Sequence, residues 1–189
     1  MNQHQPRRVR GGLRVNDPGV PWDAVLCLPF GRLGVRCTPT RLLQTEYLPG
    51  PGAPRQPAPE LAALVDELRA QLLAYCADAR HSLELPLAPA GSAFQLRVWA
   101  ALREIPVGRT MTYGELARQL GSAARAVGSA CASNPFAPLV PCHRVVARSG
   151  LGGFAGSTDD AGELLGIKRW LLRHEGALAP APGRLDDAR

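Results

Sequence analysis

The sequence predicts an α+β protein, in which a small domain of strands and one helix precedes a mainly helical domain that contains a helix-turn-helix. Residues 23–48 alternate apolar with polar or small side chains, as short strands do. Residues 60–77 carry an apolar stripe at helical spacing. Short helical segments separated by glycine and proline fill residues 93–176. Strands followed by helices, rather than alternating with them, favour the α+β class.

The N-terminal strands are indicated by Leu33, Val35 and Cys37, which alternate with small or polar residues, and by the turn-like stretches "PFGR" and "TPTR". A loop rich in proline and glycine, residues 49–59, separates the strands from the predicted helix. That helix places its apolar residues on one stripe: Leu61, Leu64, Val65, Leu68, Leu72 and Tyr75. We therefore expect residues 19–85 to form an N-terminal α+β domain, after a basic, disordered tail over residues 1–18.

Residues 86–92, "PLAPAGS", are expected to be a linker, in which Ser92 is suited to cap the next helix. That helix is predicted over residues 93–103. Two shorter helices follow over residues 113–120 and 122–133. Two short helices joined by a glycine turn are the pattern of a helix-turn-helix.

Residues 134–141 contain three prolines and cannot be helical, so we expect an extended lead into "CHRVVA", a short buried strand or turn. Residues 149–166 are predicted to be a glycine-rich loop and residues 167–176 a last helix. We therefore expect residues 93–176 to form the C-terminal domain and residues 177–189 a tail.

Composition and charge narrow the class of protein. No apolar run reaches the ~18 residues that a membrane span needs, and no signal peptide is evident, so we expect a cytoplasmic protein without membrane contact. The five cysteines lack the spacing of a zinc site or a disulfide framework, which predicts reduced thiols and no metal. The net charge is +6, and ten basic against six acidic residues lie in residues 92–176. This positive domain favours a polyanionic partner.

The second helix of the predicted helix-turn-helix, residues 122–133, carries short side chains and a single arginine, Arg125. Reading base edges in the major groove requires long polar side chains, which this helix lacks. A smooth helix could instead approach the minor groove closely and insert Arg125 into the base stack. A tightly packed pair of helices with one surface arginine explains these residues equally well.

Residues 139–146, "LVPCHRVV", place Cys142 between a proline and a histidine. A free thiol has a pKa of about 8.5, so a nucleophilic cysteine needs a base at neutral pH. His143 could relay the proton, but neighbours on an extended chain point to opposite sides, so contact with Cys142 would need a turn or a bridging water. A buried, inert cysteine beside a core histidine is the alternative interpretation.

The blocks "TYGELA", "ARAVGSACASNP", "PCHRVV" and "KRWLLRHEG", in this order, resemble the O6-alkylguanine-DNA alkyltransferases, or methylated-DNA–protein-cysteine methyltransferases. The resemblance runs from about Phe94 to Gly176 and is weaker over residues 20–85. It implies DNA repair by one irreversible transfer of the alkyl group from O6-alkylguanine to Cys142, with O4-alkylthymine as a second candidate substrate. It also implies a monomer that needs no cofactor and binds double-stranded DNA through the minor groove without sequence preference.

The resemblance assigns catalytic roles to four residues. Cys142 is the nucleophile, and His143 and Glu175 activate it through a water, which we expect to lower the pKa of the thiol well below that of a free cysteine. Tyr113 hydrogen-bonds the departing guanine.

The same resemblance places the DNA contacts on the second helix of the helix-turn-helix. Arg125 fills the gap left by the flipped nucleotide, and Asn134 ties this helix to the active-site strand. The surface beside the arginine is formed by Ala124, Ala126, Gly128 and Ser129. The substrate pocket is lined by Cys131, Val145, Gly153, Phe154 and Ala155.

Two features depart from the family pattern. Phe154 stands where many relatives have a tyrosine, and the stretch over residues 155–167 is longer than usual.

Three other functions are possible. A protein that only binds alkylated DNA would lack the nucleophile that Cys142 provides. A helix-turn-helix transcription regulator needs base-reading side chains, and a cysteine hydrolase would turn over many times without DNA.

Overall fold

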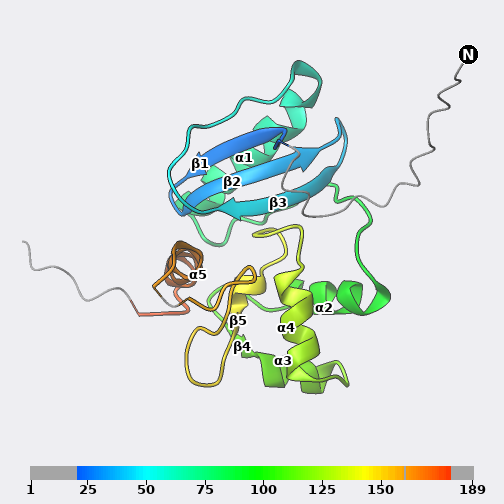
Figure 1. Ribbon diagram of the computed structural model, residues 1–189, viewed down its shortest axis with the longest axis vertical. Helices are drawn as coiled ribbons and strands as arrows, with labels where there is room; N and C mark the ends of the chain where they lie inside the picture. The colour runs from blue at the N-terminus through cyan, green and yellow to red at the C-terminus, as the bar shows by residue number, and fades with distance from the viewer. Residues whose placement is uncertain (1–20, 160, 180–189) are drawn as a thin grey trace, which may run out of the picture.

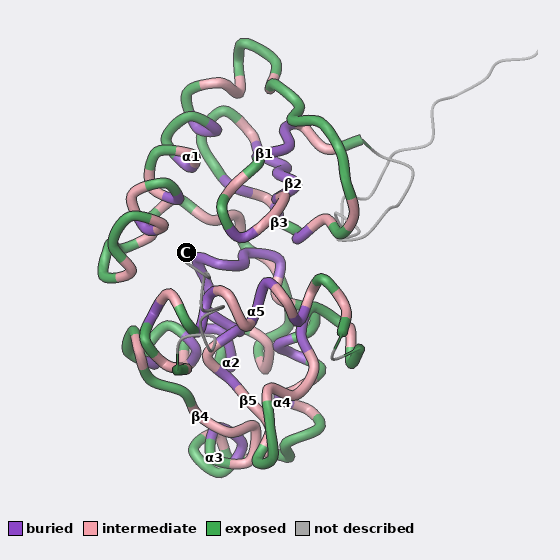
Figure 2. Tube along the Cα trace, turned by 90° about the vertical axis from the view of Figure 1, so that its left-hand side faces the viewer, coloured by how far each residue is buried: buried purple, intermediate pink, exposed green. Residues whose placement is uncertain are grey.

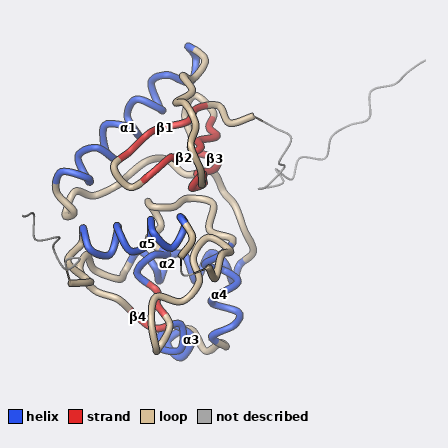
Figure 3. The backbone as a smooth tube through the Cα atoms, turned by 60° about the vertical axis from the view of Figure 1, so that its left-hand side comes forward, coloured by secondary structure: helices blue, strands red, loops and turns tan. Residues whose placement is uncertain are grey.

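The chain forms a sheet with one helix, stacked on a group of shorter helices (Figures 1 and 3). A computed structural model describes residues 21–159 and 161–179. The predicted tail over residues 1–18, and residues 180–189 of the predicted C-terminal tail, lie outside the described residues. This arrangement confirms the predicted α+β class.

The N-terminal part is a three-stranded antiparallel sheet covered by a long helix. The strands are β1 (Ala24–Leu28), β2 (Gly31–Cys37) and β3 (Leu42–Leu48), hydrogen-bonded in this order. A short 3-10 helix, η1 (Pro59–Leu61), leads into α1 (Ala62–Ala77), which lies across the sheet (Figure 1). The buried residues of α1 belong to the predicted stripe: Leu64, Val65, Leu68, Leu72 and Tyr75. The predicted strands and helix are confirmed.

Strand β2 is buried on both faces, although its alternating sequence predicts one polar face. Leu33, Val35 and Cys37 are buried as expected, and Gly34 and Arg36 are buried as well. The indole of Trp22 explains the difference. The Arg36 guanidinium lies 4.6 Å from its ring centroid, and a Cβ added to Gly34 would lie 2.5 Å from the ring. The second face is therefore covered by one aromatic ring.

The C-terminal part is mainly helical. Its helices are α2 (Ala93–Arg103), α3 (Tyr113–Gln119), α4 (Ala124–Ala132) and α5 (Glu163–His174). Ser92 caps α2 in a capping box, because its side chain accepts from Gln95 N and its own N–H donates to the Gln95 side chain. Helices α3 and α4 pack together and form the predicted helix-turn-helix (Figure 1).

Two details of this part differ from the prediction. Helix α5 begins at Glu163, so the last four residues of the predicted loop over residues 149–166 are helical. Burial of Leu165 extends the helix toward its N-terminus beyond the predicted start at residue 167. Strand β5 (Val145–Val146) lies in "CHRVVA", where a short buried strand or turn was expected, and it pairs in parallel with β4 (Met111–Thr112). Strand β4 and this pairing were not predicted, since two-residue strands carry no periodicity. The pairing fixes the start of α3 beside the segment that carries Cys142.

The two parts pack against each other along β3 and α1. Thr45 N on β3 donates to Pro135 O at 2.7 Å, and the Tyr47 and Phe154 rings lie 5.3 Å apart. The predicted linker runs beside the same strand, because Leu42 N donates to Pro86 O and Ala88 N donates to Leu42 O, both at 2.8 Å. Buried chain lies at this junction, whereas the outer surface is largely exposed (Figure 2). Within the described ranges, no helix is long and apolar enough to cross a membrane.

Candidate active site

Cys142 opens a 3-10 turn, η2 (Cys142–Arg144), at the floor of a pocket. The proline-rich segment before it ends at Pro141, and β5 follows directly. The residue is only 6% exposed, so its thiol is reached through the pocket rather than from the open surface. The pocket has a volume of about 370 Å³ and lies between α4 and the glycine-rich loop. It is large enough for one flipped base.

Most of the residues predicted for DNA contact and the substrate pocket line this cavity. They are Arg125, Gly128, Ser129, Cys131, Gly153, Phe154 and Ala155, and the predicted catalytic residue Tyr113 lines it as well. Ala124 and Ala126 do not line it, and Ala124 lies exposed on α4. Val145 is fully buried and contributes its backbone carbonyl to the site rather than a pocket wall.

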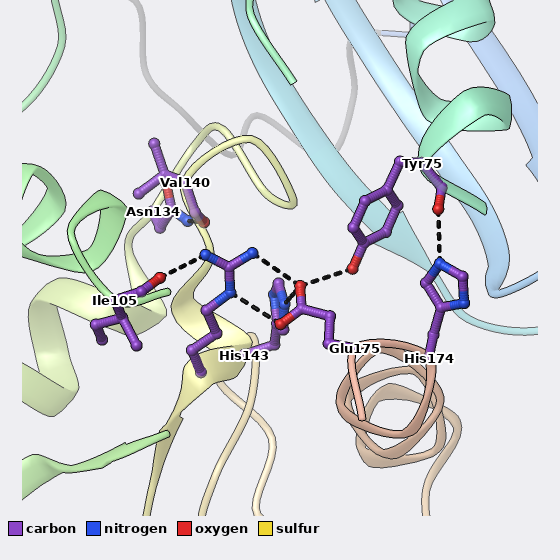
Figure 4. Close-up of polar contacts among 8 residues, drawn as sticks. Tyr75, Ile105, Asn134, Val140, His143, His174 and Glu175 are labelled. Atoms are coloured by element: carbon purple, nitrogen blue, oxygen red, sulfur yellow. Dashed lines mark hydrogen bonds and ion pairs between the residues drawn. The ribbon is translucent and has the colours of Figure 1, made fainter. Parts of the chain in front are cut away.

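His143 and Glu175, the residues predicted to activate the thiol, are in direct contact. His143 Nε2 lies 2.9 Å from Glu175 Oε1 (Figure 4). Arg144 donates to both carboxylate oxygens, from Nε to Oε2 and from Nη2 to Oε1, each at 2.9 Å. Burial alone would raise the pKa of Glu175, but hydrogen bonds from His143 and Arg144 outweigh it and lower the pKa to about 2. The carboxylate is therefore charged at neutral pH.

The same contact fixes the protonation of His143. Burial lowers the pKa of the imidazole despite the neighbouring carboxylate, so the ring is neutral at pH 7. Because Nε2 faces a carboxylate, Nε2 carries the proton and Nδ1 holds the free lone pair. Nδ1 is buried and has no hydrogen-bond partner in the described part of the chain. It is therefore the nitrogen that is available to accept a proton.

The thiol itself is less acidic than the sequence led us to expect. Burial raises the pKa of Cys142, although a hydrogen bond from Asn134 and the charge of Lys168 act in the opposite direction. The expectation that the resting pKa falls well below that of a free cysteine is therefore wrong. Proton transfer from the thiol to His143 would therefore accompany the attack of sulfur on the substrate.

Lys168, which the sequence analysis did not identify as a site residue, holds the glycine-rich loop in place. Its Nζ donates to the backbone carbonyls of Val145 and Leu151 at 2.7 Å and of Gly153 at 3.1 Å. The side chain is fully buried, and burial lowers its pKa to about 8, so it is still largely charged at pH 7. It is the single lysine among 22 basic residues, and it lies on the buried side of α5.

Tyr113 and Asn134 lie where the sequence placed them. Tyr113 begins α3, lines the pocket and donates from its hydroxyl to Gly153 O at 3.0 Å. Asn134 follows α4 and donates to Val140 O at 2.7 Å, two residues before Cys142. Its Oδ1 accepts from Phe136 N at 3.1 Å. The asparagine thus connects the end of the helix-turn-helix with the segment that carries the nucleophile.

The structure thus places a buried thiol on a base-sized pocket beside a helix-turn-helix, which is the arrangement expected of DNA-binding proteins that act through a cysteine. Comparison with known families agrees. The model for the DNA-binding domain of 6-O-methylguanine DNA methyltransferase matches residues 93–177. The chain belongs to the methylated-DNA–protein-cysteine methyltransferase family.

Individual relatives match over different shares of their length. A methylated-DNA–protein-cysteine methyltransferase of Shigella flexneri is 53% identical over 97 residues, which cover 50% of this chain and only 53% of that relative. One of Mycobacterium bovis is 42% identical over 147 residues, 76% of this chain and 78% of the relative. The crystal structure of Mycobacterium tuberculosis OGT in complex with DNA aligns with a TM-score of 0.63 at 36% identity, over 83% of this chain and 94% of that one.

Proposed function

We propose that the protein repairs O6-alkylguanine in double-stranded DNA by transferring the alkyl group to Sγ of Cys142. A bond from sulfur to the alkyl carbon forms, the bond from that carbon to O6 breaks, and the thiol proton ends on the guanine. The observation that carries this proposal is the Cys142 thiol at the floor of a base-sized pocket, with a neutral histidine and a charged glutamate behind it. O4-alkylthymine is a second candidate substrate.

The surrounding residues support each part of this step. Through a bridging water, Nδ1 of His143 would take the thiol proton as sulfur attacks, and Glu175 would stabilise the resulting imidazolium. Burial raises the pKa of Tyr113, so its hydroxyl stays protonated. When it turns from the Gly153 carbonyl, to which it donates here, it can donate a hydrogen bond to the departing guanine. The thioether product contains no group that releases the alkyl chain. Each protein molecule would therefore react once.

The partner would be DNA gripped through the minor groove by α3 and α4. Arg125 is exposed and lines the mouth of the pocket, so it can occupy the space that an extruded nucleotide leaves. Ala124, Ala126, Gly128 and Ser129 allow α4 to approach the sugar-phosphate backbone closely but cannot read bases. We propose that the protein acts as a monomer and without sequence preference, as damage can occur anywhere.

Intact-mass measurement tests the function directly. The protein is incubated with a duplex that contains one O6-methylguanine, with the unmodified duplex as control. We expect the mass to rise by one methyl group, on the peptide that contains Cys142, and to stop at one equivalent. Repeated turnover, or a methyl group on another cysteine, would contradict the proposal.

Arg125→Ala is expected to slow repair in duplex DNA by about 30-fold, because base extrusion costs a few kcal/mol and the arginine replaces the lost stacking. Reaction with the free base O6-benzylguanine should be nearly unchanged, since no base has to leave a stack. Arg103→Ala is the matched control, because Arg103 is an exposed arginine of α2 that does not line this pocket. Equal losses on duplex and free base would assign Arg125 to the pocket instead.

Binding to undamaged duplex DNA is expected to depend steeply on salt and hardly on sequence. If about four phosphates are neutralised, counterion release predicts an affinity loss of about 100-fold between roughly 50 and 200 mM salt. Titrations with two unrelated duplexes measure both properties. A flat salt dependence, or a preference above ~2 kcal/mol for one sequence, would favour a transcription regulator.

A further inference from the structure

The N-terminal domain reaches the catalytic residues through Tyr75, in the last turn of α1. The Tyr75 hydroxyl donates to Glu175 Oε1 at 2.8 Å, across 100 positions of sequence (Figure 4). The backbone carbonyl of Tyr75 accepts from His174 Nε2 at 2.6 Å, and the two rings pack edge to face with centroids 5.1 Å apart. Tyr75 is 2% exposed. The end of α1 is therefore fixed to the end of α5 at two points.

The contact with Glu175 is made at the oxygen that faces the histidine. Oε1 accepts from His143 Nε2, Arg144 Nη2 and Tyr75, whereas Oε2 accepts from Arg144 Nε. Burial and then the charge of Glu175 raise the pKa of Tyr75, so the hydroxyl donates at every physiological pH. Tyr75 and His143 thus both donate hydrogen bonds to the same carboxylate oxygen. The Tyr75 hydroxyl partly neutralises its negative charge and restricts the rotation of the carboxylate.

We propose that Tyr75 is a positioning residue for alkyl transfer, whose hydroxyl keeps the Glu175 carboxylate hydrogen-bonded to His143. The N-terminal domain thereby completes the active site. The inference rests on the function proposed above. Tyr75 does not line the base pocket and acts only through Glu175. The carboxylate would otherwise be held by residues of the C-terminal part alone, His143 and Arg144.

Loss of the hydroxyl has a predictable effect on the pH dependence of transfer. The charged and titratable groups that act on the His143–Glu175 pair are Arg144 and Cys142 of η2, Lys168 of α5, Tyr75 of α1 and Tyr47 of β3. The cavity beside the pair is also lined by Arg80, His81, Glu84, Arg103 and Glu104, none of which the Tyr75 substitution changes. Without the Tyr75 hydroxyl, Oε1 presents more negative charge to the imidazole, which raises the pKa of His143. Neutral His143 is the base, so the rate falls as pH drops through that pKa. The acid limb of the rate profile should therefore move to higher pH.

The test measures the rate of methyl transfer from duplex DNA against pH for the full-length wild type, Tyr75→Phe and Leu68→Ala. We expect Tyr75→Phe to react about tenfold more slowly at neutral pH, a fold change that corresponds to ~1.4 kcal/mol, and to show the shifted acid limb. The phenyl ring keeps its packing on His174. Leu68→Ala removes a buried side chain from the same helix without touching Glu175. It should lower the thermal midpoint and leave the acid limb in place.

A double-mutant cycle separates positioning from a general structural role. If Tyr75 acts through Glu175, adding Tyr75→Phe to Glu175→Gln should slow transfer by less than about twofold more. An unmoved acid limb, or a tenfold loss that persists in the Glu175→Gln background, would overturn the inference and leave the proposed function standing. A wild-type protein that transfers no methyl group would overturn the proposed function itself.

Discussion

Replacing Cys142 with alanine is expected to abolish alkyl transfer while leaving the affinity for duplex DNA unchanged. The rate should fall by at least about 1000-fold, because the step requires a bond to sulfur and no other group can substitute for it. A second thiol, Cys131, lines the same pocket. Burial, followed by the proximity of Cys142, raises the pKa of Cys131 to about 12, so it stays protonated at neutral pH.

Intact mass after reaction and titration of undamaged duplex measure the two properties separately. Cys131→Ala is the matched control, because it deletes a thiol from the same pocket, and it should still accept one methyl group per molecule. Stoichiometric transfer by Cys142→Ala would remove Cys142 from the mechanism. A complete loss of transfer in Cys131→Ala would show that both thiols are needed.

Helix positions could be predicted wherever local signals and burial agree. The bounds of α2 coincide with the predicted range over residues 93–103, because the Ser92 capping box marks its start and a proline follows its end. The start of α5 was missed because Leu165 becomes buried only through tertiary packing. The pairing of β4 with β5 was missed for the same reason, since it joins segments more than 30 positions apart.

The candidate site could be predicted where motifs carry the residues, and not where distant segments meet. Cys142 and His143 are neighbours in one motif, and Glu175 lies in another. Arg144 belongs to the first motif as well, but its bidentate contact appears only when α5 brings Glu175 to it. Tyr75 looked like one more apolar position of a helical stripe. Its hydroxyl gains a partner only when the two parts of the chain dock.

The acidity of the nucleophile was predicted with the wrong sign because sequence gives neighbours but not burial. The expectation of a low pKa rested on the relay through His143 and Glu175 that the family resemblance implied. Burial of the thiol disfavours the charged form by more than Asn134 and Lys168 favour it. The thiol stays protonated until a damaged DNA base enters the pocket. In the meantime it reacts slowly with other electrophiles, because the thiolate is the reactive form.

Replacing Glu175 with glutamine is expected to destabilise the fold by about 3–5 kcal/mol at pH 7, because it removes the buried counter-ion of Arg144. The difference in unfolding free energy between the wild type and Glu175→Gln should shrink in acid. The folded pKa of Glu175 is about 2, below its ordinary value of 4.5, so its stabilisation of ~3 kcal/mol is complete above pH 4.5 and lost as pH falls toward 2. Urea denaturation at several pH values measures this, with exposed Glu60→Gln as the control. Wild-type and Glu175→Gln curves that stay equally far apart at pH 3 and pH 7 would mean that the network does not hold Glu175 ionised.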